Sequence, residues 1–229
     1  MVQLWGALVG FMTGLINWFY HLTVAAGIPS YGIAIILLTV LIKLILAPLT
    51  HKQMISMRKM TQLQPKIKEV QDRYKGKDPK KAQEKVMELY KENNVNPMLG
   101  CLPLIVQMPI LMALYRALYR LQVDPDHARF LWVPDISQVY HISITQPQTL
   151  LFPILAGVTT FLQSKLTTSP TDQTQRTMLI MMPLFIAYIC TTVPAGLALY
   201  WTTFNLFGYI QQAIVNKQLG HIKEGAPSK

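Results

Sequence analysis

Lys43 is the residue whose chemical type fits its surroundings least, because it lies inside the otherwise apolar run from Thr39 to Leu49. The segment from Tyr31 to Leu49, at about 1.5 Å per residue, approaches the roughly 30 Å hydrocarbon thickness of a bilayer, which predicts a membrane-spanning helix. A cation at the bilayer centre costs roughly 2.5–3.5 kcal/mol on insertion scales, so such residues usually serve a function. Two interpretations stay open: the Lys43 ammonium lies in a polar internal groove, or its stem snorkels to the nearby interface.

Other apolar segments also carry polar residues at middle depth. Thr39 lies one helical turn before Lys43 and therefore shares its face. One face of the last apolar segment carries a row of four residues, namely Trp201, Asn205, Gly208 and Gln212. Taken singly, Trp201 fits an interfacial anchor, and Asn205 fits an interhelical hydrogen bond of about 0.6 kcal/mol. Polar groups on several apolar segments together favour a shared hydrophilic groove.

Composition and charge separate into blocks along the chain. Of its 229 residues, 51% are hydrophobic and only 14% are charged, against roughly a quarter charged in soluble domains. Twelve of the 21 lysines and arginines fall between Lys52 and Lys91, and all eleven acidic residues lie outside the apolar runs. The sequence therefore predicts a multi-spanning membrane protein with one charged loop. The net charge of +10 indicates a cytoplasmic loop rather than a DNA-binding surface.

We predict an all-α polytopic membrane protein with five transmembrane helices around a hydrophilic groove. The expected segments are an interfacial amphipathic helix on the outer side (1–28), span one (29–52), a cytoplasmic coiled-coil hairpin (53–95), span two (96–120), an outer loop (121–148), span three (149–167), a cytoplasmic turn (168–175), span four (176–193), span five (197–215) and a basic cytoplasmic tail (216–229). This topology places the N-terminus outside and the C-terminus in the cytoplasm, as the positive-inside rule requires. A sixth span over residues 1–28 is the alternative.

The hairpin is predicted from an apolar seam and a turn. The seam consists of Met60, Leu63, Ile67, Val70 and Tyr74, followed after the turn by Ala82, Val86 and Leu89. Asp78 is suited to cap the second helix, with Pro79 as its first residue. Candidate partner-binding cations on the hairpin and tail are Arg58, Lys59, Lys66, Arg73, Lys77, Lys80, Lys81, Lys217 and Lys223. They form either a solvated face or a docking arm for acidic lipid head groups, ribosomal RNA or an acidic protein.

Catalytic patterns are missing from the sequence. It has no glycine loop for phosphates, no His-Glu-x-x-His and no glycine-flanked serine elbow. No carboxylate lies in a predicted span, which disfavours a proton- or sodium-coupled transporter. We therefore predict neither an enzyme nor a bound cofactor or metal.

Three groups of motifs occur in order over nearly the whole chain. The first is Pro48-Leu49-Thr50 with Ser56-Met57-Arg58-Lys59-Met60 and Leu63-Gln64-Pro65-Lys66-Ile67. The second is Asn96-Pro97-Met98-Leu99-Gly100-Cys101-Leu102-Pro103 with Gln107-Met108-Pro109-Ile110. The third is Met182-Pro183-Leu184-Phe185 with Pro194-Ala195-Gly196-Leu197-Ala198-Leu199-Tyr200-Trp201 and Asn205. This series resembles the YidC/Oxa/Alb family of membrane protein insertases, in the five-span bacterial form that lacks a large external domain.

The resemblance implies a groove open to the cytoplasm and the lipid. Lys43 matches the family's groove arginine, and Thr39 and Trp201 match substrate-contact positions. Gln107, Gln163 and Asn205 resemble groove-lining residues. Lysine keeps the charge of arginine but loses its planar, bidentate fork.

The resemblance also implies an insertase or chaperone of the bacterial plasma membrane, working without the Sec translocon or assisting it. Implied partners are nascent membrane proteins, the lipid bilayer, the ribosome, the signal recognition machinery and the Sec translocon. Two other classes remain as alternatives: a polytopic channel or small-solute transporter, and a structural assembly factor.

Overall fold

The computed structural model describes residues 2–74, 78–96, 102–121, 123–140, 150–167 and 173–224, and the side chains at 2, 102–104, 173–175 and 219–224 lie outside that description. Its elements are α1 (Val2–Ala25), α2 (Tyr31–Tyr74), α3 (Pro79–Glu92), α4 (Leu102–Arg120), the 3₁₀ turn η2 (Pro125–His127), α5 (Leu151–Thr167), α6 (Gln173–Cys190) and α7 (Ala195–Glu224). Within these ranges the extended pairs are two isolated bridges, Phe130–Val133 and Val139–Pro194. The predicted all-helical class is confirmed.

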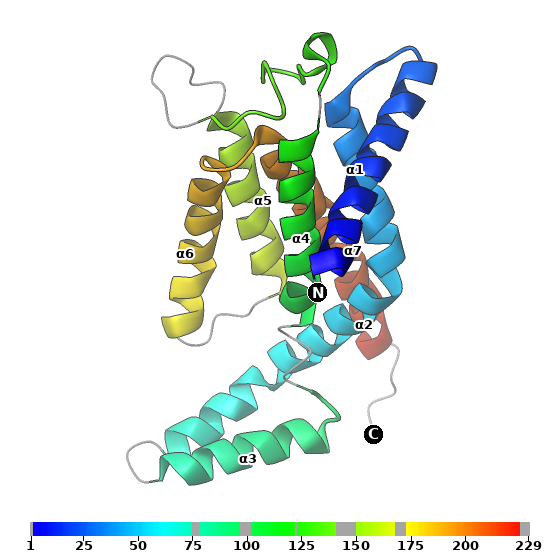
Figure 1. The fold of residues 1–229 in the computed structure, drawn as a ribbon. Helices are drawn as coiled ribbons and strands as arrows, with labels where there is room; N and C mark the ends of the chain where they lie inside the picture. Colours follow the sequence, from blue (N-terminus) through cyan, green and yellow to red (C-terminus); the bar gives the residue numbers. More distant parts are fainter. Residues whose placement is uncertain are drawn as a thin grey trace.

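Helix α2 is longer than the predicted first span. It runs unbroken for 44 residues, so the expected boundary between residues 52 and 53 falls inside a single helix. Pro48 and Pro65 lie within α2, where each removes one backbone donor and its ring crowds the preceding turn. Near Pro48, the Thr50 hydroxyl donates to the carbonyls of Leu46 and Ala47, at 3.0 and 3.1 Å. The helix bends as it leaves the bundle, as expected of a proline-containing helix (Figure 1).

The lower half of α2 and α3 form a hairpin that projects from the bundle (Figure 1). Leu63, Ile67 and Val95 are buried between the two helices, with Met60, Val86, Leu89 and Tyr90 packed against them. The predicted cap is confirmed, because the Asp78 carboxylate accepts a hydrogen bond of 3.1 Å from the backbone N–H of Lys81, with Pro79 at the first helical position. The hairpin therefore has its own small apolar core, apart from that of the bundle.

The bundle places α5 between α6 and α7, and α7 also packs along α2 (Figure 1). Gly157 allows a close approach of α5 to α6, since a Cβ there would lie 3.1 Å from the Pro183 carbonyl oxygen. Helix α7 continues to Glu224, so the first part of the predicted tail (216–229) is helical. Span four was expected to begin at 176 and end at 193, whereas α6 begins at Gln173 and ends at Cys190.

Helix α1 lies obliquely across α4 and α2 (Figure 1). It buries Val9, Met12, Ile16 and Phe19 against the bundle. Leu4, Phe11, Trp18 and Leu22 form the opposite, outward face and are 80%, 61%, 59% and 49% exposed. By length and apolar composition, Gln3–Ala25 and α2 are the two described helices that qualify to cross a bilayer, and Arg176–Cys190 is a shorter apolar helix.

The segment from residue 123 to residue 140 closes one end of the bundle. Gly196 donates its N–H to the Ile136 carbonyl at 2.7 Å, and Phe130 lies directly over Gly32. A Cβ at residue 32 would lie 2.1 Å from the Phe130 ring, so only glycine permits this contact. Val133 and Ile136 are fully buried, which seals this end with apolar side chains.

Candidate functional site

Lys43 is buried where α2 packs against α7, with 6% of its surface exposed. Its Nζ lies 3.4 Å from the centroid of the Phe204 ring, within the range of a cation–π interaction. Among the described residues, the ion pairs are Arg73–Glu69, Lys85–Glu88 and His127–Asp124, so no described carboxylate neutralises Lys43. An aromatic face offsets part of the cost of removing an ammonium from water, by about 2 kcal/mol or more when the pair is desolvated.

Two cavities meet at Lys43. The larger, of about 210 Å³, extends from Lys43 toward the hairpin end of the bundle. It is lined by Lys43, Thr50, Gln53, Met54, Met57, Gln163, Thr167, Phe204 and Gln212. The smaller, of about 150 Å³, is mostly apolar and lies between α2 and α7, beside Leu44, Phe207 and Ile210. Lys43 is thus shared by a polar cavity and an apolar one.

Gly208 makes the close approach of α7 to this cation possible. A Cβ at residue 208 would lie 2.5 Å from Gln163 Nε2 and 3.1 Å from Lys43 Nζ. The polar ends of two side chains therefore occupy the space that any other residue at 208 would need. The structure brings together Lys43 and Gln163, which lie far apart in the sequence.

Thr160 links two further predicted site residues. Its Oγ1 accepts hydrogen bonds from Asn205 Nδ2 at 2.7 Å and from Trp201 Nε1 at 3.2 Å. The Thr160 hydroxyl donates in turn to the Ala156 carbonyl at 2.7 Å. Sequence reasoning did not single out Thr160, because a threonine in an apolar helix usually satisfies its hydroxyl on its own backbone, as neighbouring Thr159 does.

Thr39 and Gln107 have other surroundings. Thr39 is fully buried, and its hydroxyl donates to the Ile35 carbonyl at 2.6 Å, so it is satisfied within its own helix. Gln107 Nε2 donates to the Tyr200 hydroxyl at 2.6 Å, and both side chains are buried where α4 meets α7. Neither Thr39 nor Gln107 lines the two cavities at Lys43.

The larger cavity also contains polar atoms without a hydrogen-bond partner among the described residues. Gln53 Nε2 and Gln212 Oε1 belong to side chains that are 4% and 1% exposed. An unpaired buried amide atom costs roughly 1–3 kcal/mol, and these two atoms are available to hydrogen-bond water or a ligand. Gln212 could be found from its spacing to Trp201 and Asn205, but Gln53 lies in a polar stretch where nothing in the sequence distinguishes it.

The cavities stop short of the end closed by residues 123–140. Ile35, Leu38, Ile136 and Tyr200 are 0% exposed and fill the bundle on that side of Lys43. At the opposite end, Thr50, Gln53 and Thr167 line the larger cavity where α2 leads into the hairpin. The polar space is therefore asymmetric along the bundle axis.

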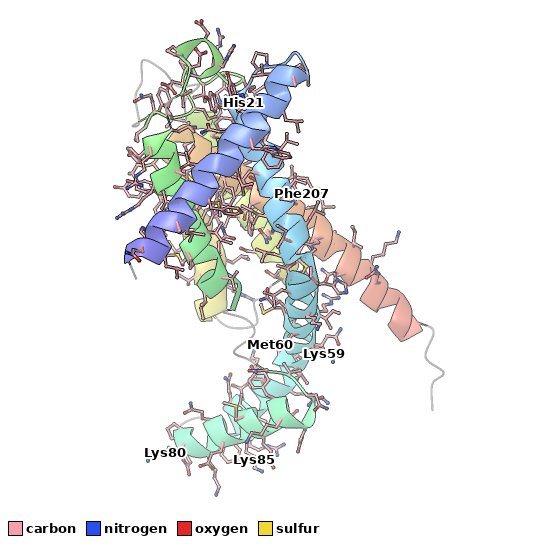
Figure 2. All side chains as sticks on the ribbon, turned by 45° about the vertical axis from the view of Figure 1, so that its right-hand side comes forward. His21, Lys59, Met60, Lys80, Lys85 and Phe207 are labelled. Carbon is pink, nitrogen blue, oxygen red and sulfur yellow. The ribbon has the colours of Figure 1, made fainter. Side chains whose placement is uncertain are left out.

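The predicted partner-binding cations lie mostly on the hairpin surface. Lys59, Lys66, Arg73, Lys80, Lys81 and, on α7, Lys217 are exposed. Figure 2 shows Lys59, Lys80 and Lys85 on the projecting hairpin. Arg58 is half-buried with an unpaired Nε, Lys77 lies outside the described residues, and so does the side chain of Lys223. In the described part of the chain, no three His, Cys, Asp or Glu side chains gather as metal ligands would.

The chain is similar to known bacterial membrane proteins. The model of the 60Kd inner membrane protein family matches residues 22–222. The chain is 42% identical over 216 residues to the membrane protein insertase YidC of Wolinella succinogenes, covering 94% of this chain and 38% of that protein. It is 40% identical over 202 residues to membrane protein insertase YidC 1 of Listeria monocytogenes, covering 85% of this chain and 67% of that protein.

A crystal structure of an active YidC insertase with its first transmembrane domain resolved has a TM-score of 0.65 and 31% sequence identity to this chain. The similarity covers 90% of this chain and 45% of that one. The chain thus spans less than half the length of this structure and of the Wolinella relative.

Apolar helices with outward-facing apolar side chains, and a cation buried among them, define a helical integral membrane protein. The chain belongs to the 60Kd inner membrane protein family, which places it with the YidC insertases of bacterial membranes.

Proposed function

We propose that this chain is a membrane protein insertase and chaperone whose positively charged intramembrane groove admits the polar tail of a client protein. The observation that carries the proposal is Lys43, which is buried without a described carboxylate partner and lines a polar cavity together with Thr50, Gln53 and Thr167. An ion pair with a client carboxylate at 4 Å would contribute about 4 kcal/mol at an effective dielectric of 20. The names of the relatives support the same activity.

The proposed topology has five spans, formed by the upper part of α2 and by α4, α5, α6 and α7. The hairpin, the connection between α5 and α6, and the C-terminus lie in the cytoplasm, and residues 123–140 lie outside. In this orientation the polar cavity opens to the cytoplasm, and the sealed end faces outward. The basic hairpin supports this orientation, because positive charge accumulates on cytoplasmic segments.

The unpaired amide atoms Gln53 Nε2 and Gln212 Oε1 suit the passage of an extended polypeptide. One offers a donor from α2 and the other an acceptor from α7, which matches the carbonyl and N–H of a peptide backbone. Backbone contacts of this kind do not depend on client sequence. The client's apolar helix would then leave sideways into lipid, driven by hydrophobic transfer, with the membrane potential acting on acidic tails.

The proposal is tested by complementation in bacteria depleted of their own insertase. Lys43→Arg is expected to support insertion of a client with an acidic tail, whereas Lys43→Ala and Lys43→Glu fail, with Glu the worst because it repels carboxylates. Lys165→Ala, which removes an exposed cation at the hairpin end of α5, is the matched control and should remain active. Full activity of all three Lys43 variants would mean that Lys43 acts only as a snorkelling anchor at the membrane interface.

Reconstituted vesicles separate the insertase from the second candidate, a polytopic channel or small-solute transporter. Purified protein is expected to insert a client with no added nucleotide. Solute flux across these vesicles without any polypeptide insertion would favour the channel or transporter.

The hairpin and tail are proposed to recruit ribosomes or targeting factors, including partners that act with the Sec translocon. Their exposed cations suit the phosphates of ribosomal RNA, with an affinity that falls as salt rises. Co-sedimentation with ribosomes tests this role. Reversal of the charges at Lys59, Lys66, Lys80 and Lys81 together with removal of residues 216–229 should weaken binding, and unchanged binding would refute recruitment.

A further inference from the structure

Arg116 is a cation that the proposed insertase activity does not use. It is exposed and lies one helical turn before Arg120, the last residue of α4. Its guanidinium carbon lies 6.0 Å from the centroid of the Trp5 ring on α1. None of the three ion pairs among the described residues involves Arg116.

A cavity of about 880 Å³ separates the first turns of α1 from α4 at this point. This volume is within the range of roughly 300–1,000 Å³ that is usual for ligand sites. Among the described residues that line it, Arg116 is the one with a charge, and the others are Leu4, Trp5, Ala7, Leu8, Phe11 and Pro109. The outward exposure of Leu4 and Phe11 indicates that the cavity opens to the surface of the bundle.

The apolar walls and the Arg116 cation each restrict which kind of molecule can fill this cavity. Apolar walls do not hold water well, and an apolar surface on a membrane protein is covered by acyl chains. A guanidinium in apolar surroundings needs an anionic acceptor, and its planar fork of donors matches the oxygens of a phosphate. Phospholipids supply both an acyl chain and a phosphate in one molecule.

The local charge also selects between kinds of phospholipid. The first 28 residues contain no Asp, Glu, Lys or Arg, so α1 brings no acidic or basic side chain of these types to the cavity. A zwitterionic lipid would bring an ammonium group for which the described lining has no carboxylate. A lipid with one net negative charge neutralises Arg116 and leaves no charge unpaired.

We propose that an anionic phospholipid binds between α1 and α4, with its phosphate on Arg116 and an acyl chain against Leu4, Leu8 and Phe11. The lipid fills the space that the side chains leave open and thereby fixes the first turns of α1 against α4. The site is distinct from the cavities at Lys43, which are lined by α2, α5 and α7. It depends on α4 lying in the bilayer and does not depend on insertase activity.

The test measures lipid selectivity of the full chain in phosphatidylcholine nanodiscs that each hold one copy. Spin-labelled phosphatidylglycerol is compared with spin-labelled phosphatidylcholine for the fraction immobilised at the protein surface. The native chain is expected to prefer phosphatidylglycerol on the order of fivefold, the effect of one Arg near a lipid phosphate. Arg116→Gln should reduce the preference to near unity.

Arg120→Gln is the matched control, because it removes a neighbouring exposed cation of α4 that does not line the cavity. It should keep most of the preference. Ala7→Trp, which fills the cavity and leaves Arg116 in place, should lower the immobilised fraction of both labelled lipids.

Three results would overturn the proposal. An unchanged preference in Arg116→Gln, or an equal loss in Arg120→Gln, would mean that the lipid preference comes from the general positive charge at the interface and not from a site at Arg116. Loss of the preference on adding inorganic phosphate would identify a phosphate site that needs no lipid. A preference present in liposomes but missing in discs with one copy would assign this surface to contact with a second copy of the chain.

Discussion

Gly208 on α7 faces the ammonium of Lys43 on α2, and a Cβ at residue 208 would lie 3.1 Å from Lys43 Nζ. The same Cβ would lie 2.5 Å from Gln163 Nε2. The missing side chain of a glycine therefore creates the room in which two polar side chains from α2 and α5 meet. This relationship makes Gly208 a sensitive position for testing the cavity.

Gly208→Ala is expected to lower client insertion while changing the free energy of unfolding by less than about 1 kcal/mol. The colliding atoms are the ends of flexible side chains, which move at little cost but then leave their positions in the cavity. Gly208→Leu should also destabilise the fold, by roughly 1–3 kcal/mol, because it overpacks the helix contact. Thermal unfolding in detergent and an insertion assay measure the two effects.

Gly14→Ala is the control for these variants, since a Cβ at residue 14 meets nothing within 4 Å. Combining Gly208→Ala with Gln163→Ala should give a non-additive result, because the second change removes the closest colliding atom. Additive losses of insertion would contradict a shared space at these two residues.

Thr160→Val should destabilise the protein and reduce insertion together. The substitution keeps the shape but removes the acceptor of Trp201 and Asn205, and each buried donor left unpaired costs roughly 1–3 kcal/mol. Thr160→Ser should restore both properties. Thr159→Val serves as control because Thr159 bonds only carbonyls of its own helix, and an equal loss there would argue against a role for the Trp201 and Asn205 hydrogen bonds.

Tyr200→Phe should lower the free energy of unfolding by roughly 1–3 kcal/mol. It keeps the ring but leaves the buried amide of Gln107 without its acceptor. Tyr188→Phe, at a side chain that is 62% exposed, should change stability by no more than about 0.5 kcal/mol. Equal thermal unfolding of both variants would mean that the Gln107–Tyr200 bond contributes nothing measurable.

The hairpin is expected to loosen at alkaline pH. Burial raises the pKa of Tyr90 above its usual 10.0, because the apolar seam favours the neutral phenol. The stabilising contribution of Tyr90 is therefore fully present below pH 10 and is lost as the pH rises through the folded-state pKa. Spin labels at Lys68→Cys and Lys81→Cys, two exposed positions on α2 and α3, should report a broader separation at that pH.

Tyr90→Phe should abolish this alkaline transition, whereas Tyr74→Phe in the same hairpin should keep it. The Glu88 carboxylate also raises the pKa of Lys85. The larger cause is its hydrogen bond with the Lys85 ammonium, and the next is its negative charge. That pair is on the surface and titrates at high pH too, so a transition that persists in Tyr90→Phe would point to Lys85 instead of the seam.

The sequence by itself determined the helical class, the hairpin with its cap at Asp78, and the position of Lys43 as a cation in an apolar run. These features depend on local periodicity, on turn chemistry and on the cost of a charge among apolar neighbours. All three can be recognised from the order of neighbouring residues. The motif series was long enough to identify the family.

Only the tertiary structure decided which polar residues meet. Lys43 and Gln163 share a cavity, Thr160 joins Trp201 and Asn205, and Gln107 lies apart with Tyr200. The sequence gives a residue's face on its own helix, but the partner of that face depends on how helices cross, and the crossings are set by small residues such as Gly157 and Gly208. The unbroken course of α2 through Pro48 is likewise a tertiary result, because packing on both sides of the proline outweighs its local tendency to end a helix.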